Sequence, residues 1–388
     1  MIVYIKTQGS KIIKEGRHLL VKKGNDIYHT LFTYKLDQIL LFGNIEITHN
    51  ALCMLMKNNI DTVYLTRYGR YLGRIAPPEA KNVFLRKRQY QLLDDNEFAL
   101  KTAKSIVAGK LTNMVTLMMR IKRTKNSKDA GDKARQIRKL LKLLYQAETL
   151  DSVRGYEGRG SAIYFSGLCH GFTGQTDFTK RVRRPPTDPV NSVLSLLYTF
   201  LMNRVYSAAR IAGLDPYPGF LHVIDYGRYS LVLDLMEEFR PTIVDTLVLS
   251  LFNLKILQET DFRFEIPDVS DSLSSRNQDS HMPDVNADPI GMMTLNHDDT
   301  QKNFDVPEQK VEVTPDNASN ATGKYPVKLN LDAFAKVISA FEKKLSASFY
   351  YPPAGRNMTY ADVIIYQAAQ YRKVIEGTVD AYQPLMLR

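Results

Sequence analysis

Cysteine is scarce in this chain of 388 residues, and long apolar runs are absent. The two cysteines, Cys53 and Cys169, are too few and too far apart for a disulfide framework or a paired-cysteine zinc motif. The most apolar stretch, residues 193–201, falls short of the roughly 18 residues that a membrane-spanning helix needs. The first residues have the pattern of a β-strand and lack the features of a signal peptide. We therefore expect a soluble, cytoplasmic protein with no membrane partner.

Several motifs of nucleotide binding and hydrolysis are also missing. The chain contains no GxxxxGK[ST] phosphate loop, no GxGxxG after a strand, no HExxH and no GxSxG. ATP-driven chemistry and serine hydrolysis are therefore poor candidates.

Positive charge is in excess, and it is unevenly distributed. The 52 Lys and Arg residues outnumber the 41 Asp and Glu residues, which gives a net charge of +11. Residues 259–323 contain 14 acidic and four basic residues, a net charge of −10, so the rest of the chain carries +21. A body this basic favours a polyanion such as nucleic acid as partner, although many basic proteins bind none.

Hydrophobic periodicity changes once along the chain. Short apolar runs separated by turn residues predict β-strands before the adjacent prolines Pro77 and Pro78, and three- and four-residue spacing predicts helices after them. We therefore expect an α+β fold, in which a small β-sandwich-like domain precedes an all-α domain. The expected division is a β-rich domain at 1–76, a linker at 77–83, a first helical part at 84–258, an acidic insertion at 259–323 and closing helices at 324–388.

The helical part contains two features of particular interest. Asp188 and Pro189 predict the start of a long apolar helix over residues 190–211, at the centre of the second core. Between Arg120 and Lys142 there are ten basic and two acidic residues, and Gly131 suggests a loop between two basic helices. These helices could follow a DNA backbone, and a solvated helix face explains the same charges. The insertion is poor in aromatic residues, which predicts disorder.

Three acidic residues and one histidine have unusual neighbours. Asp234 and Glu237 share one helix face in an apolar segment, where carboxylates need a counter-charge. A divalent metal ion or a cation such as Arg240 would provide it. His222 lies among apolar residues, as a metal ligand or a core histidine would. Glu157 has three glycines close by, which permits close backbone approach and is equally consistent with an ordinary turn.

Taken together, these side chains supply the oxygen and imidazole ligands that Mg²⁺ and Mn²⁺ sites of phosphoryl transfer use. A basic cluster falls between Glu157 and His222 in the sequence and would offset the repulsion between such acids and a polyanion. Its members are Lys180, Arg181, Arg183 and Arg184.

Four stretches resemble the signature of the CRISPR-associated adaptation integrases, in the family's order and over nearly the whole chain. They are RGYEG at 154–158, RPPTDPVN at 184–191, GFLH at 219–222 and LDLMEEFRP at 233–241. The resemblance implies an N-terminal β-domain that forms a homodimer and a helical catalytic domain. It also implies that Glu157, His222 and Glu237 bind Mg²⁺ or Mn²⁺ and that Asp234 is a further catalytic acid.

The resemblance extends to DNA and to partners. Arg86 and Gln89 resemble a family element near the DNA path, and Asn191 would support the site from the neighbouring helix. Such proteins work with a small ferredoxin-like adaptation partner in a larger heterocomplex. The acidic insertion departs from the family pattern, and it would serve as a DNA mimic, a partner tether or a tolerated surface loop.

The implied function is metal-dependent DNA integration. The 3′-hydroxyl of a short foreign fragment, the spacer precursor, attacks a phosphodiester at the edge of a CRISPR repeat and adds a new spacer. The attacking oxygen belongs to DNA, so neither a protein nucleophile nor ATP is required. Two alternatives stay open: a metal-dependent nuclease that cuts branched DNA without integrating it, and a non-catalytic DNA-binding scaffold.

Overall fold

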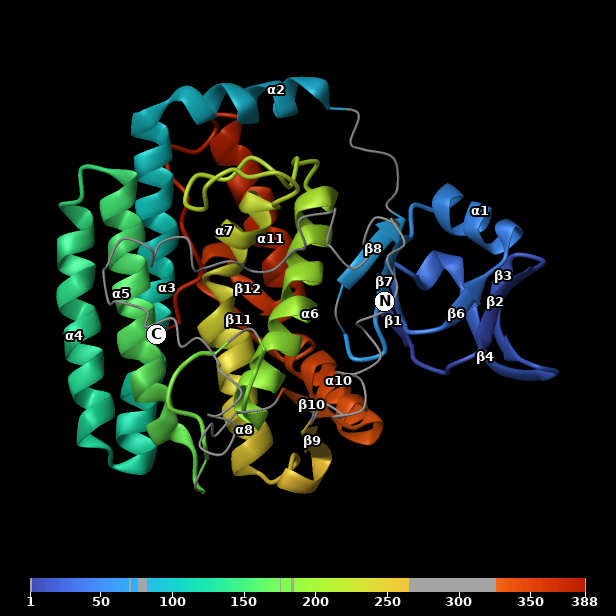
Figure 1. Cartoon of the computed structure of the whole chain (residues 1–388). Helices are drawn as coiled ribbons and strands as arrows, with labels where there is room; N and C mark the ends of the chain where they lie inside the picture. Colours follow the sequence, from blue (N-terminus) through green and yellow to red (C-terminus); the bar gives the residue numbers. More distant parts are fainter. Residues whose placement is uncertain are drawn as a thin grey trace, which may run out of the picture.

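The computed structural model of the chain describes residues 2–69, 71–75, 82–174, 176–182, 185–264 and 326–387. A β-rich region at the N-terminus lies beside a larger helical region (Figure 1). The predicted α+β fold, β-structure first and helices after it, is confirmed. None of the helices in these ranges has the length and unbroken hydrophobicity that crossing a membrane requires. Most of the predicted linker lies outside the described residues.

Two four-stranded sheets form the β-rich region. Their apolar faces share one core, in which Ile12, Leu19, Ile39 and Leu41 are fully buried. The first sheet has the order β1-β5-β7-β8, with β8 antiparallel to its neighbour, and contains β1 (Ile2–Ile5), β5 (Gln38–Phe42), β7 (Asp61–Leu65) and β8 (Tyr71–Ile75). The second has the order β4-β3-β2-β6 and contains β4 (Asp26–Phe32), β3 (His18–Lys23), β2 (Ser10–Glu15) and β6 (Ile45–Ile47). The short helices are η1 (Thr33–Lys35) and α1 (His49–Lys57).

Long helices build the rest of the molecule. The helix α3 packs against α4 and α5 on one side of the helical region, and α6 packs against α7 and α11 (Figure 1). The helices are α2 (Val83–Gln91), η2 (Leu92–Asp94), α3 (Asn96–Lys125), α4 (Lys128–Tyr145), α5 (Leu150–Leu168), η3 (Cys169–Gly171), α6 (Pro189–Ile211), α7 (Ser230–Met236), the π-helix η4 (Arg240–Asp245), α8 (Thr246–Asn253), η5 (Glu259–Asp261), α10 (Leu331–Leu345), η8 (Pro352–Ala354) and α11 (Tyr360–Ile375). Two two-stranded antiparallel sheets complete the fold, β9 (Phe262–Phe264) with β10 (Val327–Leu329) and β11 (Ser348–Tyr351) with β12 (Arg356–Thr359).

The start of α6 is the one that the sequence predicts. The side chain of Asp188 accepts a hydrogen bond from the amide of Asn191, and Pro189 occupies the first helical position, where no intrahelical N–H bond is lost. Sixteen of the residues of α6 are buried. The helix therefore forms the centre of the second core, as expected.

Two details differ from the predictions. The joint between α3 and α4 lies at Asn126 and Ser127, whereas Gly131 belongs to α4. A Cβ at Gly131 would lie 2.9 Å from Cδ of Lys122, so this glycine serves the close approach of two helices and not a turn. Residues 259–264, assigned to the acidic insertion, form η5 and β9 because β9 pairs with β10. The rest of the predicted insertion, up to residue 323, lies outside the described residues.

The two regions are joined by buried polar and aromatic contacts. Arg74 of β8 pairs with Asp61 at 2.9 Å, and its guanidinium lies 3.5 Å from the ring centroid of Tyr206 in α6. Phe42 of β5 packs edge-on against Phe334 of α10, with 5.0 Å between the ring centroids. The first sheet is therefore part of the core that also holds the helices.

Candidate active site

Glu157 lies within a helix and not in a glycine-rich turn. It belongs to α5, where it is 3% exposed, and its Oε1 accepts a hydrogen bond of 2.9 Å from Oγ of Ser161. A Cβ on Gly160 would come within 2.4 Å of Cδ2 of Leu111 on α3. This glycine therefore allows α5 to approach α3 closely, which turns Glu157 toward α3.

A buried lysine that the sequence reasoning missed lies between two of the predicted acids. Lys110 of α3 is only 2% exposed, and its Nζ forms ion pairs with Oε1 of Glu157 and, at 2.7 Å, with Oε2 of Glu237. Lysine is almost never fully buried unless it is paired. Lys110 stands on the apolar face of α3, between the buried Val107 and Met114, and a lone charge in such a face is the signal that could have identified it.

Asp234 holds His222 and its loop in place. The Oδ2 atom of Asp234 accepts hydrogen bonds from the amides of Phe220 (2.7 Å) and Leu221 (3.0 Å), and Oδ1 accepts one from the amide of His222 (3.0 Å). The same Oδ1 lies 2.7 Å from Nδ1 of His222. Because this carboxylate is an acceptor, we assign the ring proton to Nδ1, so that Nε2 carries the lone pair and has the chemistry of a metal ligand. Nε2 lies 3.7 Å from Oε1 of Glu237.

Arg240 provides a second positive charge at Glu237. Its Nε lies 3.2 Å from Oε1 of Glu237, and its guanidinium lies 4.8 Å from the ring centroid of Tyr198. Of the two acids for which the sequence suggested Arg240 as a counter-charge, Glu237 does pair with Arg240. Asp234 is held instead by backbone amides and His222.

Two further buried carboxylates, those of Glu238 and Asp245, fix the backbone around Glu237 and Arg240. Glu238 accepts hydrogen bonds from the hydroxyl of Tyr382 (2.9 Å) and the amide of Leu385 (2.5 Å), and burial raises its pKa to about 8. Asp245, at the end of η4, accepts hydrogen bonds from the hydroxyls of Tyr164 (2.6 Å) and Tyr198 (2.7 Å), and burial raises its pKa to about 6. The backbone that carries Glu237 and Arg240 is thereby held against α5, α6 and the C-terminal segment.

The predicted metal ligands meet in space, with an ammonium among them. Within the described ranges, no group of three or more His, Cys, Asp or Glu side chains stands ready to hold a metal ion as the structure is. The donor types nevertheless fit a divalent cation, because two carboxylates face one positive charge and His222 turns Nε2 toward Glu237. The Nζ of Lys110 occupies the position between Glu157 and Glu237.

Of the two residues predicted near the DNA path on α2, one is buried. Nε2 of Gln89 donates to the carbonyl of Asp215 (3.1 Å), and Oε1 accepts from the amide of the same residue (2.9 Å). The side chain of Gln89 is buried and anchors the chain before His222, and its place near a DNA path stays a prediction. Arg86 is partly exposed and pairs with the carboxylate of Asp215 at 3.3 Å.

Asn191 likewise lies inside the protein. It is buried, its Nδ2 donates to the carbonyl of Lys180 (2.9 Å), and its Oδ1 accepts from Nη1 of Arg181 (2.8 Å) and the amide of Val182 (3.0 Å). Asn191 thus shapes the basic segment, and its predicted support of the site from α6 stays a prediction. Lys180 is exposed and Arg181 is half-buried. Arg183 and Arg184 lie outside the described residues.

Comparison with known proteins identifies the family. The family model described as CRISPR associated protein Cas1 matches residues 3–270. A Rhodospirillum rubrum protein named CRISPR-associated endonuclease Cas1 2 is 37% identical over 277 residues, which cover 67% of this chain and 78% of that protein. Both findings agree with the family that the four sequence stretches resemble.

Solved structures share the fold. A casposase bound to its integration product superimposes with a TM-score of 0.75 at 20% identity, over 100% of this chain and 94% of the casposase. A chain of a Cas6-RT-Cas1–Cas2 complex also gives a TM-score of 0.75, at 21% identity, and this chain covers 36% of that longer chain. The predicted family is confirmed: the chain belongs to the Cas1 family of CRISPR-associated proteins.

Proposed function

We propose that this chain is a DNA strand transferase of CRISPR adaptation, which inserts short DNA fragments into a CRISPR array as new spacers. The observation that carries the proposal is the convergence of Glu157, Glu237 and His222 from three separate segments, with the ring of His222 oriented by Asp234. Two findings support this class of reaction. The related Rhodospirillum rubrum protein is named as an endonuclease, and the casposase of similar fold is bound to an integration product.

Each residue has a role in this reaction. Glu157, Glu237 and the Nε2 atom of His222 would hold a Mg²⁺ or Mn²⁺ ion, which supplies Lewis acidity and charge neutralisation when bound. Asp234 keeps the proton of His222 on Nδ1, so that the other ring nitrogen stays an acceptor. Lys110 and Arg240 offset the negative charge of the carboxylates, which lets a phosphodiester approach.

The chemistry conserves the number of phosphodiester bonds. A DNA 3′-hydroxyl forms a new O–P bond at the edge of the repeat, the existing O–P bond breaks, and the proton of the attacking hydroxyl leaves as the departing 3′-oxygen gains one. The energy of the broken bond is retained in the new one, so no nucleotide cofactor is needed. The spacer precursor and the CRISPR repeat are the two DNA partners.

We further propose that the protein works in the cytoplasm as a homodimer joined through its β-rich region, together with a small ferredoxin-like partner. The exposed apolar side chains of β4 support dimerisation there, since Ile27 is 55% and Tyr28 is 47% exposed. A chain of similar fold occurs in a Cas6-RT-Cas1–Cas2 complex, which supports a heterocomplex.

The test is strand transfer of a labelled, 3′-hydroxyl DNA fragment into a plasmid that carries a CRISPR repeat, with Mn²⁺ or Mg²⁺ and the partner present. Wild type is compared with His222→Ala and with His170→Ala, a partly exposed histidine of η3. We expect joined product from the wild type and His170→Ala, and at least a roughly hundredfold loss for His222→Ala.

Other outcomes separate the alternatives. Joining by His222→Ala would mean that the site is misplaced. Cutting of branched DNA without joining would favour the nuclease, and DNA binding without either reaction would favour the scaffold.

A further inference from the structure

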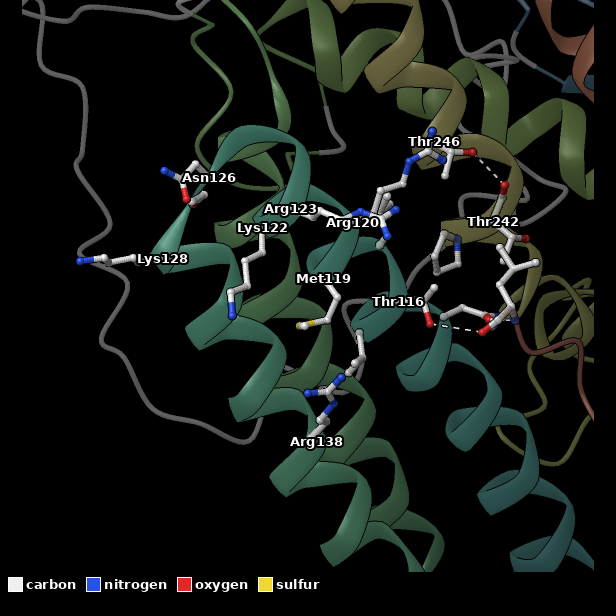
Figure 2. Close-up of a pocket in the computed structure, with 16 residues that line it drawn as sticks. Thr116, Met119, Arg120, Lys122, Arg123, Asn126, Lys128, Arg138, Thr242 and Thr246 are labelled. Atoms are coloured by element: carbon white, nitrogen blue, oxygen red, sulfur yellow. Dashed lines mark hydrogen bonds between the residues drawn. The ribbon is translucent and has the colours of Figure 1, made fainter.

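A segment that is far from the catalytic cluster in the sequence packs directly behind it. Beyond α11 the chain runs along α3 over residues 382–387 (Figure 1). A Cβ at Gly109 of α3 would lie 2.5 Å from Cβ of Pro384, so this glycine allows the segment to approach the helix closely. Further along α3, the hydroxyl of Thr116 donates to the carbonyl of Leu387 at 3.3 Å, one of the hydrogen bonds drawn in Figure 2.

The side chain of Asn113, also on α3, joins this segment to the residue that follows Glu237. Its Nδ2 donates to the carbonyls of Glu238 (3.0 Å) and Leu385 (2.7 Å), and its Oδ1 accepts from the amide of Leu387 (2.9 Å). Both N–H groups of this buried amide are therefore used. One side chain thus holds α3, the backbone after α7 and the 382–387 segment against one another.

The carboxylate of Glu238 holds the segment from the other side. It accepts hydrogen bonds from the hydroxyl of Tyr382 (2.9 Å), the amide of Leu385 (2.5 Å) and Nε2 of Gln367 (3.2 Å). The ring of Tyr382 also packs edge-on against Tyr371 of α11, with 5.2 Å between the ring centroids. A buried network whose polar groups are paired in this way fixes one arrangement of the elements that it joins.

We infer that the 382–387 segment is a positioning element of the active site, which sets the distance between Lys110 on α3 and Glu237 at the end of α7. Asn113 lies three residues after Lys110, on the same helix. Glu238 directly follows Glu237, so the segment is bonded to both sides of their ion pair. The inference rests on the proposed function of the site, and the residues that carry it act through this ion pair and not on DNA.

Small displacements matter at this pair. The Nζ of Lys110 lies 2.7 Å from Oε2 of Glu237 and also pairs with Glu157, and all three side chains are buried. A binding constellation must be held to within about 0.5 Å, and the loss of a group that orients metal ligands lowers metal affinity by about 10- to 100-fold. Loss of the Asn113 hydrogen bonds should therefore weaken the binding of a divalent cation and expose Lys110 to reagents in solution.

The experiment measures two properties of the full-length protein. Mn²⁺ affinity is measured from the electron paramagnetic resonance signal of the unbound ion. The exposure of Lys110 is measured as its rate of acetylation by an N-hydroxysuccinimide ester, followed by mass spectrometry. The test variant is Asn113→Ala. The matched control is Asn203→Ala, which replaces a buried asparagine of α6 whose side chain bonds to Thr199 and Arg74.

We expect Asn113→Ala to bind Mn²⁺ at least about tenfold more weakly than the wild type, and its Lys110 to be acetylated at least about tenfold faster. Asn203→Ala removes a buried amide of the same kind at a separate site, so both properties should stay within about twofold of the wild type. Equal changes in the two variants would show a role in stability alone and overturn the inference. Unchanged Mn²⁺ affinity and acetylation in Asn113→Ala would overturn it as well.

A milder pair of variants keeps the test decisive if Asn113→Ala does not fold. Tyr382→Phe removes one hydroxyl that donates to Glu238, and Tyr366→Phe removes one that donates to the carbonyl of Pro353. Weaker Mn²⁺ binding in Tyr382→Phe alone, by at least about threefold, supports the inference, and equal binding by the two variants overturns it. If the wild type joins no DNA but Asn113→Ala still loses Mn²⁺ affinity, the proposed function fails and the positioning role stands.

Discussion

Replacing Lys110 by Met tests the charge balance of the candidate active site. Methionine has a similar shape and no charge, so the substitution removes one ammonium and leaves two buried carboxylates, Glu157 at 3% and Glu237 at 0% exposure. Removing one partner of a buried ion pair costs about 3–5 kcal/mol, because the remaining charge is left in a poorly solvated place. Glu237 keeps Arg240 as a partner, which favours the lower end of that range.

The loss of stability in Lys110→Met should depend on divalent cations. With EDTA, we expect the free energy of unfolding of Lys110→Met to be about 3 kcal/mol below that of the wild type. With Mn²⁺ at about 100 times its dissociation constant, a site in the folded state gains about 2.7 kcal/mol, so Mn²⁺ should restore most of the loss in the variant. The wild type should gain less, because Lys110 already neutralises the two acids.

The assay is urea unfolding, followed by circular dichroism, with EDTA and with Mn²⁺. Lys101→Met, an exposed residue of the same helix, is the control and should differ from the wild type by less than about 0.5 kcal/mol in both conditions. Equal stability of Lys110→Met and the wild type in EDTA would refute the role of the lysine. If Lys110→Met loses the same stability with EDTA and with Mn²⁺, the hypothesis that a metal ion can take the place of the Lys110 ammonium is refuted.

Two further predictions concern the surroundings of the site. Burial raises the pKa of Glu238 from 4.5 to about 8, so the folded state binds more protons than the unfolded state between these values. Stability should therefore fall by about 2–3 kcal/mol between pH 6 and 9 and stay level above that, as measured by urea unfolding, and Glu238→Gln should remove this dependence. A Cβ at Gly219 would lie 2.6 Å from the carbonyl carbon of Ser230, so Gly219→Ala should cost about 2–3 kcal/mol and release His222 from Asp234. Gly155→Ala, with open space around its Cβ, is the control and should be neutral or stabilising; equal effects would contradict the steric argument.

Local sequence patterns determined the order of the secondary structure. Short apolar runs separated by turn residues predicted the strands before residue 77, because buried strands are short and turns delimit them. The cap at Asp188 and the proline after it predicted the start of α6, since both act within one turn of the helix. The family signature predicted Glu157, His222, Asp234 and Glu237 as site residues, and in the structure these side chains lie close to one another and to Lys110.

Contacts between distant segments decided the rest. Three glycines in a short stretch suggested a turn around Glu157, yet packing on α3 makes it a helix, in which Gly160 gives room to Leu111. The resemblance placed Gln89 near a DNA path and Asn191 in support of the site, and only the structure shows that both side chains are buried and bond to the backbone of neighbouring loops.

Lys110 shows most clearly that local sequence patterns do not predict contacts between distant residues. It lies 47 residues before Glu157, and no local period connects the two. The sequence alone determined which chemical groups the protein has and which elements carry them. Only the tertiary structure decided which charges meet, because burial and charge pairing arise from side chains that are far apart in the chain and come together on folding.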